Sequence, residues 1–122
     1  MQFRSLSLAA IGAVFLALTA WAHHSHSNYQ KEFTHLEGTV KGVRWINPHA
    51  WIYLEVMDDK GQPAVWALEG GGPAALTRGG WKRDDVKVGD TIKVRCLQLK
   101  DGSNGCLLGF VTPKGGVEKE FD

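Results

Sequence analysis

Apolar and polar residues alternate in the first half of the chain with the two-residue period of half-buried β-strands. In residues 36–45, Leu36 and Val40 share one parity, whereas Val43 falls on the opposite one. This change of parity predicts a β-bulge or kink near Gly42.

A second strand is expected at residues 51–57, where two sets of side chains alternate. Ile52 and Leu54 form one face, and Trp51 and Tyr53 form the other. We expect the aliphatic face to point into the core, which leaves two aromatic side chains on the other face that need an explanation.

Turn-forming residues divide the rest of the chain into short elements. Asn47-Pro48 ends the first strand, because a proline cannot donate a hydrogen bond to the ladder. Pro73 stands where a first helical turn accepts proline, and Gly79 lies just past the end of that helix. The expected strands are therefore 36–45, 51–57, 63–69, 91–99 and 106–112, and the expected helix is 73–78.

This order of elements is typical of one fold. Three strands, a small helix and two strands, with a long bulged first strand, form the pattern of an OB-fold. We predict an all-β protein: a small five-stranded OB-fold-like barrel with one short helix between strands 3 and 4, preceded by a signal peptide. The expected divisions are a signal peptide at 1–22, a flexible histidine-rich arm at 23–34, the barrel domain at 35–112, and a C-terminal tail at 113–122 that frays unless Val117 and Phe121 pack it down.

The first 22 residues have the composition of a signal peptide. Arg4 is their only charge, and residues 6–19 form an almost wholly apolar run that is too short to span a bilayer comfortably. Ala20-Trp21-Ala22 has the small-x-small form of a cleavage site. We expect cleavage after Ala22 rather than an uncleaved anchor, and a periplasmic or secreted product with no membrane span.

Charge argues against one class of partner. Cleavage removes Arg4 from the 14 basic residues and leaves the 13 acidic ones, so the mature chain is neutral. Most nucleic-acid binders carry a basic surface, so nucleic acid ranks low among the expected partners.

The two cysteines are expected to form a disulfide. Cys96 and Cys106 lie ten residues apart on either side of the turn residues 101–105, and export would place them where thiols oxidise. If the hairpin is centred near Asp101, the two cysteines lie directly opposite each other across the ladder. The Cys-x-x-Cys spacing of a redox or metal-binding dithiol is missing.

Histidines just after the cleavage site are candidate metal ligands. Cleavage would make His23 the first residue, with His24 and His26 close behind. A free amine and several imidazoles suit Cu(II) before other common divalent ions. Because the third residue is Ser25, the chelate with histidine in third position is absent. The alternative, which stays open, is that these histidines are a solvated and accessible linker.

A second group of candidates joins the first two strands, at the edge where OB-folds commonly bind ligands. Trp45, Trp51 and Tyr53 could offer stacking surfaces to a ligand. Asn47 and His49 could add hydrogen bonds and, for His49, a metal-binding nitrogen. The alternative is that Asn47 caps a turn and that the tryptophans cover the mouth of the barrel.

Other polar residues give weaker signals. Glu69, followed by three glycines, is interpreted as a strand-end residue in preference to a metal-binding or catalytic carboxylate. His35 could approach His49 across the barrel, but the spacing does not show it. The chain lacks a nucleophile-base signature, a phosphate loop and a dinucleotide fingerprint, so nothing argues positively for an enzyme.

Several motifs occur together along the mature chain. They are His23-His24-Ser25, Trp45-Ile46-Asn47-Pro48-His49, Trp66 with Glu69, residues 76–81, Gly89-Asp90, and Lys100-Asp101-Gly102 before Gly105-Cys106. Together they resemble an exported bacterial family, domain of unknown function 6152. The resemblance covers nearly all of the mature chain and implies export and a small β-barrel, without an activity to transfer. It also favours a shared function for the first two histidines and His49.

We therefore expect a periplasmic, non-enzymatic binding domain. Its site is expected to combine the arm histidines with His49 around a divalent metal, copper first. The alternative is a metal-free module that binds a small molecule, a glycan or a periplasmic protein on the face of Trp45, Trp51 and Tyr53.

Overall fold

A computed structural model of the protein describes residues 26–122. The signal segment and the candidate ligands His23 and His24 lie outside these residues. The described elements are η1 (His26–Asn28), β1 (Thr34–Arg44), β2 (Trp51–Met57), β3 (Pro63–Glu69), α2 (Pro73–Arg78), β4 (Thr91–Gln98), β5 (Gly105–Thr112) and β6 (Lys119–Glu120).

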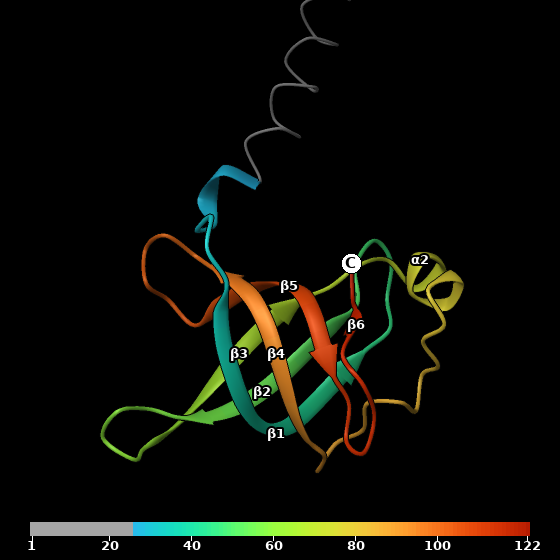
Figure 1. Ribbon diagram of the computed structural model, residues 1–122. Coiled ribbons are helices and arrows are strands. Elements are labelled where there is room, and N and C mark those ends of the chain that lie inside the picture. Colours follow the sequence, from blue (N-terminus) through green and yellow to red (C-terminus); the bar gives the residue numbers. More distant parts are fainter. Residues whose placement is uncertain (1–25) are drawn as a thin grey trace, which may run out of the picture.

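Five of the strands close into a barrel (Figure 1). The sheet runs β3-β2-β1-β4-β5-β6. A short parallel pairing of β3 with β5 closes the five strands from β3 to β5 into the barrel, and β6 extends the sheet beyond β5. Helix α2 lies between β3 and β4 in the chain. The predicted all-β, OB-like barrel with one short helix is therefore confirmed.

Strand β1 is shared between two neighbours, which explains its length of 11 residues. Its first half pairs with β4, and its second half pairs with β2. The register shifts between Val40 and Gly42, so the bulge predicted near Gly42 is confirmed. Gly38 lies where the strands press together, because a side chain there would collide with the backbone of Glu55.

The side chains of β2 alternate between the inside and the outside of the barrel, as the sequence predicts. Ile52 and Leu54 are fully buried in the core. Trp51 and Tyr53 lie between them in the chain and are only half-buried. The aliphatic set is thus the inner face of the barrel, and both aromatic side chains lie on its outer face.

The last residues pack onto the barrel, in contrast to the expected fraying. β6 pairs with β5, and Phe121 is only 1% exposed, whereas Val117 is 75% exposed. The Phe121 ring packs edge-on against Trp81, with 4.8 Å between ring centroids, and Trp81 Nε1 donates to the carbonyl of Glu120 at 2.6 Å. Gly70 makes room, because a Cβ there would meet the Phe121 ring. Strand pairing, hydrogen bonds and the buried Phe121 ring together hold the tail.

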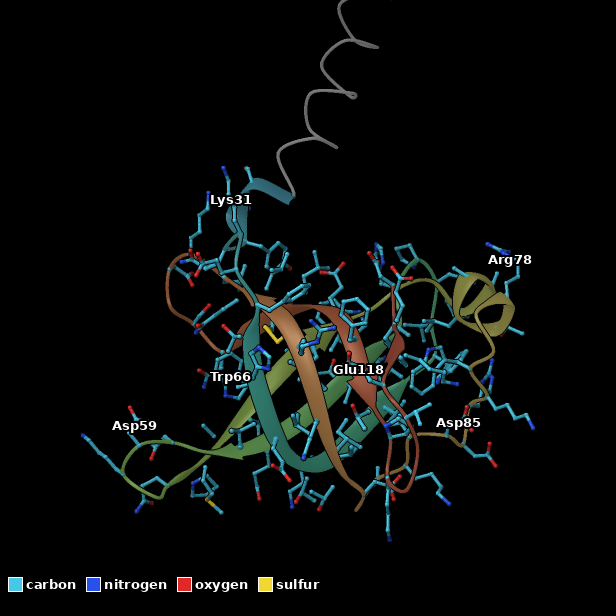
Figure 2. The ribbon with its side chains drawn as sticks, viewed as in Figure 1. Lys31, Asp59, Trp66, Arg78, Asp85 and Glu118 are labelled. Carbon is cyan, nitrogen blue, oxygen red and sulfur yellow. A yellow bond between two sulfur atoms is a disulfide. The ribbon has the colours of Figure 1, made fainter. Side chains whose placement is uncertain are left out.

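A disulfide links β4 to β5 (Figure 2). Cys96 and Cys106 are bonded, with 5.6 Å between their Cα atoms, which confirms the pairing. Their expected position directly opposite each other is wrong: Cys96 faces Leu108, and Cys106 faces Gln98. The hairpin is centred on Gly102, one residue later than expected, where a φ of 79° favours glycine.

The arm before β1 is partly ordered, which corrects the expectation of a loosely held segment. Tyr29 forms an antiparallel bridge with Leu99, and the Gln30 amide donates to the carbonyl of Gln98 at 2.7 Å. The end of the arm therefore lies along the β4–β5 hairpin, as Figure 1 shows beside the orange loop.

Candidate functional site

Three polar side chains from distant parts of the chain meet at one end of the barrel. They are Tyr29 of the arm, His49 of the β1–β2 loop and Glu69 at the end of β3. The Glu69 carboxylate lies in the middle, with a different neighbour at each oxygen. These contacts define the Tyr29–Glu69–His49 cluster.

The β1–β2 loop holds His49 in a fixed position. The Ala50 amide donates to the carbonyl of Gly71, and the Ala50 carbonyl accepts from the amide of Gly70. His49 Nδ1 lies 3.0 Å from the carbonyl oxygen of Gly70. Because a carbonyl only accepts, Nδ1 carries the hydrogen, and the neutral ring presents the lone pair of Nε2.

That lone pair faces a carboxylate oxygen. His49 Nε2 lies 3.5 Å from Glu69 Oε1, and the side chains of His49 and Glu69 are 45% and 22% exposed. A neutral imidazole nitrogen and a carboxylate oxygen are both acceptors, so they do not bond to each other directly. The pair suits a positive species between them, either a second proton on the ring or a metal cation.

Tyr29 holds the other oxygen of the carboxylate. Its hydroxyl donates to Glu69 Oε2 at 3.1 Å. Burial, the negative charge of Glu69 and this hydrogen bond raise the pKa of Tyr29 to about 12. The phenol therefore stays protonated at neutral pH and acts as a donor.

The predicted metal ligands are only partly within the described residues. His23 and His24 lie outside them, and His26 begins η1 three residues before Tyr29. Within residues 26–122, no group of three or more His, Cys, Asp or Glu side chains is arranged to hold a metal ion. At the Tyr29–Glu69–His49 cluster, the barrel offers the His49 imidazole and the Glu69 carboxylate as candidate ligands.

The predicted ligand-binding face is on β2 and the loop before it. Trp51 and Tyr53 are half-buried, and Asn47 is exposed. Trp45 packs against the core, with the Arg83 guanidinium 5.8 Å from the centre of its ring. Trp45 therefore helps to cover the barrel, and it is half-buried like Trp51 and Tyr53.

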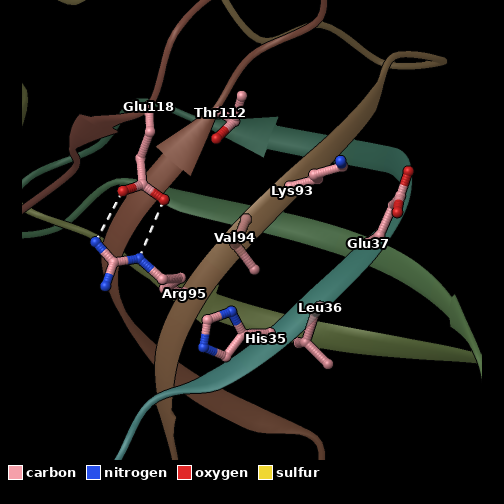
Figure 3. A pocket seen from close by; sticks show the side chains of 8 residues that line it. All are labelled: His35, Leu36, Glu37, Lys93, Val94, Arg95, Thr112 and Glu118. Atoms are coloured by element: carbon pink, nitrogen blue, oxygen red, sulfur yellow. Dashed lines mark hydrogen bonds and ion pairs between the residues drawn. The ribbon is translucent and has the colours of Figure 1, made fainter.

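A separate hollow of ≈ 440 Å³ lies on the outer face of β1 and β4 (Figure 3). Its Arg95 binds Glu118 through two hydrogen bonds of 2.8 and 3.0 Å. His35, Glu37 and Lys93 also line it, so charges of both signs are present. The structure places His35 here, whereas His49 bonds to Gly70.

Sequence reasoning missed the partnership of Tyr29 and Glu69. The two residues are 40 positions apart, and no spacing rule brings them together. The available signals were a tyrosine in a mostly polar arm and a carboxylate directly before three glycines.

Comparison with known proteins identifies the family. A model described as a family of unknown function (DUF6152) matches residues 12–108, most of the chain. The chain belongs to the DUF6152 family. The resemblance inferred from the motifs is confirmed, and the segment matched to DUF6152 contains all three residues of the Tyr29–Glu69–His49 cluster.

Other comparisons add little to the DUF6152 assignment. No curated protein and no solved structure matches the chain. None of the helices in residues 26–122 has the length and apolar character needed to cross a membrane.

Proposed function

We propose that this DUF6152 protein is an exported, non-enzymatic binding domain that holds a divalent metal, copper first, between its barrel and its amino-terminal arm. The observation that carries the proposal is the orientation of His49. A metal-binding histidine usually donates its other ring hydrogen to a carbonyl or carboxylate, and His49 does so to Gly70.

The spacing of His49 and Glu69 supports a cation between them. Nitrogen and oxygen ligands bound at roughly 2.0–2.2 Å lie about 2.8 to 3.1 Å apart on a square metal and about 3.3 to 3.6 Å apart on a tetrahedral one. The observed separation of His49 Nε2 and Glu69 Oε1 is 3.5 Å. A small side-chain movement is sufficient to bring both atoms to one metal.

The arm would supply the remaining ligands. His23, His24 and His26 carry imidazoles, and cleavage after Ala22 would add a free amine. A site rich in nitrogen ligands favours Cu(II) by affinity and geometry. The disulfide supports the export on which this cleavage depends, since such bonds persist in oxidising compartments.

Native mass spectrometry of the protein from a periplasmic extract, with and without added copper, tests the proposal. We expect the intact mass of a chain whose first residue is His23, with one copper ion that stays bound in the presence of a competing chelator. His49→Ala should weaken binding by about tenfold or more, whereas His35→Ala, on the outer face of β1, should not. A different first residue, or equal copper affinity in both variants and the wild type, would refute the shared site.

A second function has an observation of its own. Trp51 and Tyr53 remain partly exposed on the outer face of the barrel, where a small molecule, a glycan or a protein could stack. If Trp51→Ala abolishes capture of such a partner and leaves copper affinity unchanged, the aromatic face becomes the favoured site.

A further inference from the structure

Resting on the proposed function, we infer that Glu69 is the carboxylate ligand of the metal site and that Tyr29 is a positioning residue that fastens the histidine-bearing arm beside it. The sequence alone favoured a strand-end role for Glu69 and gave Tyr29 no role. The inference stands on the geometry of the cluster and on the way the arm is anchored.

Glu69 is built into a rigid position. It ends β3, where it pairs with Trp51 of β2 on one side and with Leu107 of β5 on the other. Pairing on both sides fixes the backbone from which the carboxylate projects. Its Oε1 faces His49, and its Oε2 accepts the Tyr29 hydroxyl. Oε1 is therefore the oxygen through which Glu69 would share a metal with His49.

Tyr29 is anchored through its backbone as well as its side chain. The bridge to Leu99 and the neighbouring bond from Gln30 to Gln98 hold the chain against the hairpin. The hydroxyl then ties the arm to Glu69. A protonated phenol donates to the carboxylate and does not compete with it for a cation.

This anchoring places the root of the arm next to the barrel half of the site. His26 precedes Tyr29 by three residues, which reach at most about 11 Å when fully extended. A short tether raises the effective concentration of the arm imidazoles at Glu69 and His49. Loss of the Tyr29 hydroxyl should therefore weaken metal binding although the phenol itself is not a ligand.

The inference is tested by titrating the mature protein with Cu(II) against a competing chelator, and by recording the visible absorption and electron paramagnetic resonance of the copper. Glu69→Gln keeps the size and an acceptor for Tyr29 but removes the charge, so we expect about tenfold weaker binding or more, with a shifted spectrum. Tyr29→Phe should weaken binding by about tenfold and have little further effect in a Glu69→Ala background, where residue 69 no longer accepts the hydroxyl. Glu55→Gln, which removes a carboxylate paired with Lys41 at 3.7 Å on the outside of β2, is the matched control.

The outcomes separate this inference from the proposed function. If His49→Ala weakens binding but Glu69→Gln and Tyr29→Phe bind copper with wild-type affinity and spectrum, the inference fails and the proposed function stands. If none of the three changes affinity, both fail. Thermal unfolding of each metal-free variant identifies any that do not fold. If Glu69→Gln does not fold, Glu69→Asp takes its place; because it keeps the charge, it should retain more copper affinity than Glu69→Gln.

Discussion

Replacement of Phe121 by alanine should cost this small domain a large part of its stability. The side chain is 1% exposed, and its transfer from water is worth roughly 2–3 kcal/mol. The edge-on contact with Trp81 adds about 0.5–1.5 kcal/mol. We therefore expect a loss of about 3–4 kcal/mol, against a total of about 5–15 kcal/mol for a typical domain.

Urea unfolding monitored by tryptophan fluorescence measures this loss, because Trp81 is the ring that Phe121 covers. Val117→Ala is the matched control in the same tail, since that side chain is 75% exposed and should change stability by less than about 0.5 kcal/mol. If Phe121→Ala unfolds at the same urea concentration as the control, the last residues do not belong to the core and the reasoning is refuted.

Two further predictions concern pH and the disulfide. The pKa of Tyr29 is about 12 in the folded protein against about 10 in an unfolded chain, so its contribution to stability is present below pH 10 and is lost as pH rises toward 12. Absorbance titration at 295 nm should show the ionisation of this phenol as a step near pH 12, and Tyr29→Phe should remove that step. A titration unchanged by the substitution would contradict this assignment. Removal of the link between Cys96 and Cys106 by a double alanine substitution should cost at least about 2–3 kcal/mol, from the entropy of the short loop it closes, and an unchanged thermal midpoint would count against this estimate.

Local patterns were sufficient to predict most of the fold. The strands 51–57 and 63–69 and the helix 73–78 have the expected bounds, since alternation and turn residues act over a few positions. The parity change at Gly42 marked the bulge in β1. The centre of the last hairpin was displaced by one residue, because the turn residues 101–105 offer more than one place for a positive φ.

The candidate site was harder to predict, because its contacts join distant segments. His49 could be named from its motif, but its bond to Gly70 depends on how the β1–β2 loop meets the glycine run. Phe121 could likewise be named as a residue that packs the tail down, but the place of its ring beside Gly70 and Trp81 depends on the fold. Neither contact has a period or a spacing that a sequence could reveal.

The glycine run after β3 has a practical consequence for how this protein is produced. The Gly71 amide donates to the carbonyl of Phe121, and a side chain on Gly71 would meet Asp122, while the adjacent Gly70 carbonyl orients His49. A polyhistidine tag fused directly after Asp122 would therefore begin beside the candidate ligands and bring competing imidazoles to them. Copper affinities should be measured on protein purified without such a tag.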